Sequence, residues 1–122
     1  MTPLGGYDNA WLFDGWKAGV VKPVVTVQSQ LTGIKLAMTT DQPSVQMYTG
    51  NFLNGTNTTT RIQRKKSQSF GSKPQYYHYR GAFTLEAQQY IDAVNNPNFP
   101  SITLKKGERY SQIATYTFTV DA

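Results

Sequence analysis

The sequence predicts an all-β fold, an antiparallel β-sandwich, in a single domain that covers residues 1–122. Aromatic residues make up 13% of the chain and include eight tyrosines, and together with the frequent Thr and Val they favour strands. Short runs with alternating polar and apolar residues recur between turn signals. No segment has a convincing helical period, so strands and loops should account for the fold.

The first expected elements are a hairpin and a third strand. Residues 24–31 and 34–38 are β-branched or alternating, and Thr32 and Gly33 between them are typical of a turn. Residues 45–49 form the third strand, in which Gln46 faces the side opposite to its apolar neighbours.

Strand character returns at residues 76–85 after a long irregular stretch. A last hairpin is expected between residues 101–104 and 110–120, since Lys105-Lys106-Gly107-Glu108 reads as its turn. The final run alternates Thr with apolar residues, which predicts a strand with one apolar face.

Residues 54–75 are expected to form a long basic loop. No acid occurs between Asp41 and Glu86, whereas six bases do: Arg61, Arg64, Lys65, Lys66, Lys73 and Arg80. Basic residues near tyrosines can bind single-stranded nucleic acid. Charged runs in loops are more often solvated surface, and no nucleic-acid-binding motif accompanies these, so nucleic acid is not the expected partner.

Several classes of chemistry are excluded by composition. The chain has no cysteine and one histidine, which excludes disulfides, thiolate chemistry and a metal site built on two histidines. No apolar run reaches the roughly 20 residues of a membrane helix. The first six residues lack the basic and apolar segments of a secretory signal. The sequons at Asn54 and Asn57 would matter only in a secreted protein.

Two carboxylates are candidate site residues. Glu86 closes a strand-like run and precedes a polar loop with two prolines, where a carboxylate could serve as a general base. Asp8 lies in the turn Gly6-Tyr7-Asp8-Asn9, and an acid beside an aromatic ring and an amide suits sugar hydroxyls. On composition alone, the simpler interpretations are that Glu86 is a surface residue and that Asp8 forms an Asx turn. His78, in a run of tyrosines, is more typical of a structural or exposed residue.

Three stretches resemble the aldose 1-epimerase (galactose mutarotase) family, and the likeness runs from about residue 6 to residue 120. They are Gly6-Tyr7-Asp8-Asn9, Met47-Tyr48-Thr49-Gly50-Asn51-Phe52-Leu53, and Leu85-Glu86-Ala87-Gln88 followed by Asp92-Ala93-Val94-Asn95-Asn96-Pro97-Asn98-Phe99-Pro100. The resemblance implies part of a mutarotase-like supersandwich. It also implies that Glu86 matches the catalytic base and that Asp8 matches an aspartate holding sugar hydroxyls.

The chemistry implied by the resemblance interconverts the α and β anomers of an aldohexose such as glucose or galactose. A base removes the proton from the C1 hydroxyl, an acid protonates the ring oxygen, and the opened ring closes on the other face. No cofactor or metal is needed, and each proton carrier typically contributes about 10²–10⁴-fold.

The chain departs from the family pattern most seriously at the acid. The family's acid is a histidine from its N-terminal half, and His78 does not occupy the matching place. We therefore expect a C-terminal portion with little activity alone, which pairs with a missing N-terminal half or self-associates. The alternative is a non-catalytic carbohydrate-binding or interaction module that contacts sugar through Asp8, Trp11 and Trp16.

Overall fold

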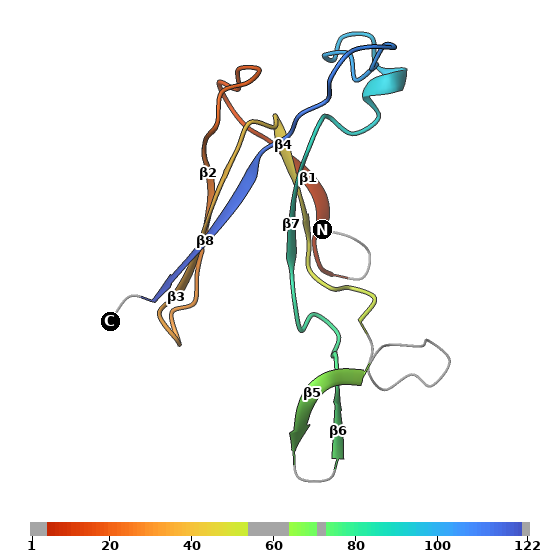
Figure 1. The fold of residues 1–122 in the computed structure, drawn as a ribbon. Helices are drawn as coiled ribbons and strands as arrows, with labels where there is room; N and C mark the ends of the chain where they lie inside the picture. Colours follow the sequence, from red (N-terminus) through yellow and green to blue (C-terminus); the bar gives the residue numbers. More distant parts are fainter. Residues whose placement is uncertain (1–4, 54–63, 71–72, 121–122) are drawn as a thin grey trace. The chain divides into compact units, whose positions relative to one another are not determined.

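The computed structural model describes residues 5–53, 64–70 and 73–120. Within these ranges the chain forms eight strands and one short 3-10 helix (Figure 1): β1 (Asp8–Leu12), β2 (Lys22–Gln28), β3 (Ile34–Thr40), β4 (Ser44–Tyr48), β5 (Arg64–Phe70), β6 (Lys73–Tyr76), β7 (Thr84–Gln88), η1 (Ala93–Asn95) and β8 (Ala114–Val120). No helix in this part of the chain has the length and apolar character to cross a membrane. The predicted all-β class is confirmed.

The strands form three sheets, with the orders β1-β4-β7, β2-β3-β8 and β5-β6. The chain also divides into two compact units. The first contains residues 1–9 and 46–86, and the second contains residues 10–45 and 87–122. Strands β1, β4 and β7 each contribute residues to both units.

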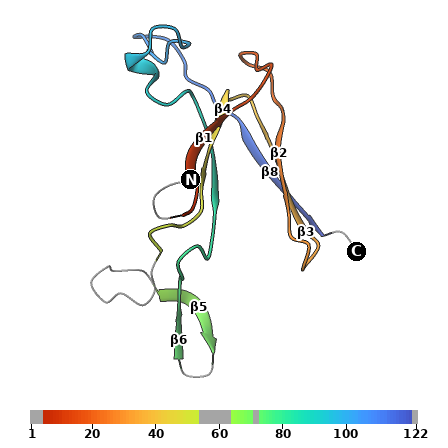
Figure 2. The same ribbon diagram turned by 180° about the vertical axis from the view of Figure 1, so that it is seen from behind.

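The sheet β2-β3-β8 belongs to the second unit, and its strands lie side by side in both views (Figure 1 and Figure 2). The predicted hairpin is confirmed, since β2 and β3 pair antiparallel around a turn in which the Ser29 N–H donates to the Ile34 carbonyl at 2.8 Å. Gly33 supplies the positive φ, 70°, that this turn needs. Pro23 lies on the edge strand β2, where its missing N–H breaks no interior pairing.

The core of the second unit lies under β3. Its side chains alternate, so that Leu36, Met38 and Thr40 are buried while the residues between them are half-buried. Met38 is fully buried, and Val45 at the start of β4 is also inside. A period of two with one buried face is what a half-solvated antiparallel sheet requires.

Two sequence-based expectations were wrong. Residues 101–104 form no strand, and the partner of β8 is β3, in an unbroken antiparallel register from Ile34↔Val120 to Thr40↔Ala114. The predicted turn does form, because the Glu108 N–H donates to the Lys105 carbonyl at 3.0 Å. A tight turn therefore closes a loop here and does not join two paired strands.

The expected irregularity of residues 54–75 was also wrong in part. β5 and all but the last residue of β6 lie inside that range, and the two strands pair antiparallel, with Arg64 opposite Tyr76. The sequence of β5 does not alternate between polar and apolar residues, so only its backbone pairing with β6 identifies it as a strand. Arg61 and the sequons at Asn54 and Asn57 lie outside the described residues.

Candidate functional site

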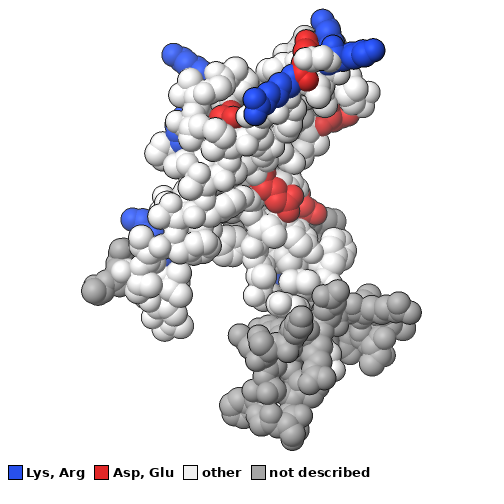
Figure 3. All heavy atoms as spheres, in the orientation of Figure 1, with Lys and Arg blue, Asp and Glu red and all other residues white. Residues whose placement is uncertain are grey.

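Both candidate carboxylates lie on the sheet β1-β4-β7, in residues of the first unit. Asp8 begins β1, Glu86 is the third residue of β7, and β4 runs between these two strands. Both side chains are exposed. In the space-filling view, acidic side chains gather over this sheet (Figure 3), and Asp8 and Glu86 are the only acids that its three strands carry.

Gln46 of β4 contacts Asp8 directly. Its side-chain Nε2 donates a hydrogen bond of 2.7 Å to the Asp8 Oδ1. The carboxylate can only accept here, so the amide oxygen of Gln46 points away from it. That oxygen, Oε1, is buried and has no hydrogen-bond partner. A buried acceptor without a partner costs free energy.

The carboxylate of Glu86 is held by its own strand. The Thr84 hydroxyl donates to Glu86 Oε1 at 2.7 Å, which is possible because residues two apart project from the same face. Leu85 between them is 7% exposed and faces the other side. Glu86 is thus oriented by one hydrogen bond while its carboxylate stays open to solvent.

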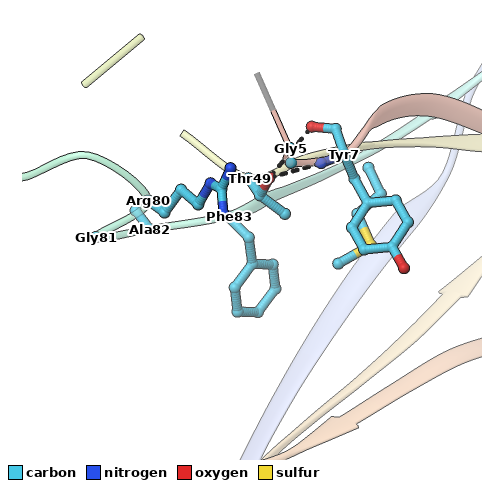
Figure 4. Close-up of a pocket in the computed structure, with 9 residues that line it drawn as sticks. Gly5, Tyr7, Thr49, Arg80, Gly81, Ala82 and Phe83 are labelled. Carbon is cyan, nitrogen blue, oxygen red and sulfur yellow. Dashed lines mark hydrogen bonds between the residues drawn. The ribbon is translucent and has the colours of Figure 1, made fainter. Parts of the chain in front are cut away.

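The opposite face of this sheet carries a pocket of about 430 Å³, lined among others by Tyr7, Met47 and Phe83 (Figure 4). Neighbouring residues along a strand point to opposite faces. Within β4, Met47 faces this pocket, so its neighbour Gln46, the partner of Asp8, faces the other side. Neither Asp8 nor Glu86 lines this pocket, so it is not the candidate site.

The turn that leads into Asp8 is fastened by two side chains from the end of β4. The Tyr7 N–H donates to Thr49 Oγ1 at 2.9 Å, as Figure 4 shows, and Asn51 Nδ2 donates to the Tyr7 carbonyl at 2.8 Å. Thr49 Oγ1 also donates to Asn51 Oδ1 at 2.9 Å. A Cβ on Gly6 would lie 1.8 Å from Asn51 Oδ1, so only glycine allows this close approach. The motif residues Thr49 and Asn51 thus help to fix the position of Asp8.

His78 lies outside any strand, in the turn before β7. Its carbonyl accepts from the Gly81 N–H at 2.8 Å, and its side chain is exposed. Arg80 in this turn has a φ of 55°, an uncommon value for a residue with a Cβ. The guanidinium of Arg80 stacks 4.7 Å from the centre of the Tyr79 ring.

The alternative hypothesis, a non-catalytic binding module, also uses the aromatic residues Trp11 and Trp16. Trp11 is in β1 and is 51% exposed. Trp16 is half-buried, and its indole N–H donates to the Asp41 carbonyl at 2.8 Å in the second unit. Only Asp8 of the three belongs to the first unit.

Comparison with known proteins assigns the family. The sequence model of the family described as aldose 1-epimerase matches residues 1–117, and the chain therefore belongs to the aldose 1-epimerase family. It is 40% identical over 117 residues to galactose mutarotase from Bos taurus and 34% identical over 117 residues to that from Homo sapiens. Over 118 residues it is 32% identical to aldose 1-epimerase from Escherichia coli.

These matches cover nearly all of this chain and a smaller part of each relative. They take in 96%, 96% and 95% of the chain, respectively, but 30% of each of the three relatives. The chain thus spans about a third of the length of the proteins it resembles. The expectation of a partial, mutarotase-like β fold agrees with this coverage.

Sequence reasoning did not single out Gln46. The alternation of residues 45–49 placed its side chain on the face opposite Val45 and Met47, but no local pattern joins residue 46 to residue 8. The signal is the tertiary pairing of β1 with β4, together with the unpartnered amide oxygen.

Proposed function

We propose that this chain supplies the base and part of the sugar-binding surface of an aldose 1-epimerase that interconverts the α and β anomers of glucose or galactose. The observation that carries the proposal is the Asp8 carboxylate, held by Gln46, on the same three-stranded sheet as Glu86. Family membership supports the same reaction class.

In this proposal Glu86 accepts the proton of the C1 hydroxyl. The Thr84 hydroxyl fixes one carboxylate oxygen, which leaves the other for the substrate. Asp8 accepts hydrogen bonds from sugar hydroxyls, and the Gln46 amide holds its carboxylate in place. Two strand spacings separate β1 from β7, roughly 10 Å, so a hexose lying over β4 would meet groups from both strands.

The reaction also needs an acid for the ring oxygen. As that proton arrives, the bond from C1 to the ring oxygen breaks, and the C1 aldehyde turns before closure. We propose that this acid comes from the part of the family's length that the present sequence does not span. The isolated chain should then accelerate mutarotation of α-D-glucose little or not at all in polarimetry.

A chimeric enzyme tests the assignment of roles. Residues 1–117 would replace the matched segment of bovine galactose mutarotase, and we expect the chimera to catalyse mutarotation. Glu86→Gln should lower kcat by about 10²–10⁴-fold, the typical contribution of one proton carrier. Asp8→Asn should raise KM, because it removes an acceptor for the sugar.

The matched control is Glu108→Gln. Glu108 is exposed and accepts from the Lys105 N–H in a turn, a bond that glutamine can keep. Equal rates for the Glu86→Gln and Glu108→Gln chimeras would refute Glu86 as the base. Sugar binding without any turnover in the parent chimera would favour the non-catalytic carbohydrate-binding module.

A further inference from the structure

A second pocket lies entirely within the second unit, built from residues that the epimerase proposal does not use. Its volume is about 480 Å³, within the size range of small-molecule sites. The lining includes an indole, a carboxylate, two amides and two hydroxyl side chains: Trp16, Asp41, Gln42, Gln89, Ser101 and Ser111.

A hydrogen-bond chain fixes the polar side of this pocket. Asp41 Oδ1 accepts from Gln42 Nε2 at 2.9 Å and from the Ile113 N–H at 3.0 Å. Gln42 is 3% exposed, and its Oε1 accepts from Gln89 Nε2 at 3.0 Å. The side chains of Asp41, Gln42 and Gln89 are thus held in place before a ligand arrives, which reduces the ordering cost of binding.

The indole of Trp16 is anchored in a similar way. Its N–H donates to the Asp41 carbonyl at 2.8 Å, and its ring centre lies 6.5 Å from that of Tyr90. The ring of Tyr90 in turn contacts Phe99 edge-on, with 5.0 Å between centres. The aromatic wall is therefore supported by packing as well as by a hydrogen bond.

The charge of the lining selects the ligand class. Among the described residues that line the pocket, Asp41 is the only charged one. A lone carboxylate disfavours anions and leaves a neutral, hydroxyl-rich ligand or a cation. The amides and serines both donate and accept, as vicinal hydroxyls require, and the flat indole suits the C–H face of a sugar ring.

We propose that this pocket is a second binding site for a neutral monosaccharide, separate from the Asp8 and Glu86 face. It requires neither Glu86 nor catalysis, so it stands or falls independently of the proposed function. Its occupant is a hexose that packs on Trp16 and hydrogen-bonds to the Asp41–Gln42–Gln89 group.

The chain offers a direct reporter for this site. It has two tryptophans, so Trp11→Phe leaves Trp16 as the only indole. In this background we expect D-galactose, titrated to 100 mM, to produce a saturable change in emission. Asp41→Asn should weaken the apparent affinity at least fivefold. Ala18→Tyr, at an exposed lining position, should occlude the pocket without altering the hydrogen-bond chain.

Asp14→Asn is the matched control, because it removes an equal charge from an exposed position outside the pocket lining. This control and Glu86→Gln should both leave the titration unchanged. The proposal fails if Trp16 emission does not respond to galactose, or if Glu86→Gln abolishes the response while Ala18→Tyr does not. A response to tetramethylammonium in place of galactose would also overturn it.

Discussion

Asn51 shows how one buried side chain can set the position of a functional one. It is 4% exposed and joins the Tyr7 carbonyl to the Thr49 hydroxyl, directly before Asp8. Asn51→Ala would leave the Tyr7 carbonyl and Thr49 with fewer partners inside the first unit. We expect a loss of about 1–3 kcal/mol in the free energy of unfolding, measured with urea. The exposed Asn98→Ala should change it by less than about 0.5 kcal/mol, and equal losses would refute this role.

Asp41 gives the stability a defined dependence on pH. Burial raises the pKa of Asp41, but hydrogen bonds from the Gln42 side chain and from backbone N–H groups outweigh burial and lower it below its ordinary 3.8. A lowered pKa in the folded state means that the ionised carboxylate stabilises the fold at higher pH. This contribution is lost as pH falls below about 3.8 and through the folded-state pKa.

The free energy of unfolding should therefore differ most between the parent chain and Asp41→Asn well above pH 3.8, and the difference should narrow as pH falls below about 3.8. Thermal unfolding across this pH range measures the difference, with Asp14→Asn as the reference for loss of an exposed acid. A difference that persists unchanged at low pH would contradict the role given to the ionised carboxylate.

At the scale of elements, local patterns predicted the strands better than their partners. β2, β3 and β4 follow from alternation and from the turn at Gly33, and these signals lie within a few residues. The pairing of β8 with β3 joins residues about 80 positions apart, and no local signal carries it. The turn at Lys105–Glu108 suggested the nearer partner and was misleading.

In the candidate site, too, some residues could be predicted from local sequence and others could not. Family motifs marked Asp8 and Glu86 as candidates, and the sheet order brings their strands to either side of β4. Gln46 and the pocket at Trp16 depend on contacts between distant segments, such as Asp41 with Ile113. Functional residues in a turn or at a strand end can be predicted from the sequence, whereas a site formed by the contact of distant segments cannot.

At the scale of the molecule, much apolar surface lies open. Few large apolar side chains are buried in the described residues. The apolar face of the sheet β2-β3-β8 includes further side chains, on β8, that are exposed. Phe118 pairs with Leu36 and Val120 with Ile34, so these side chains share the face of the core, yet Phe118 and Val120 are each 69% exposed. Contiguous apolar surface of this kind marks an association site.

We therefore expect the chain to self-associate, with sedimentation velocity showing larger species as concentration rises. Phe118→Lys should raise the dissociation constant at least tenfold, because burying one such side chain contributes about 1.5–3 kcal/mol and tenfold corresponds to about 1.4 kcal/mol. Thr117→Lys adds the same charge on the opposite face of β8, opposite Ala37, and should have a smaller effect. A chain that stays monomeric throughout, or equal effects of the two variants, would show that this face is not the contact surface.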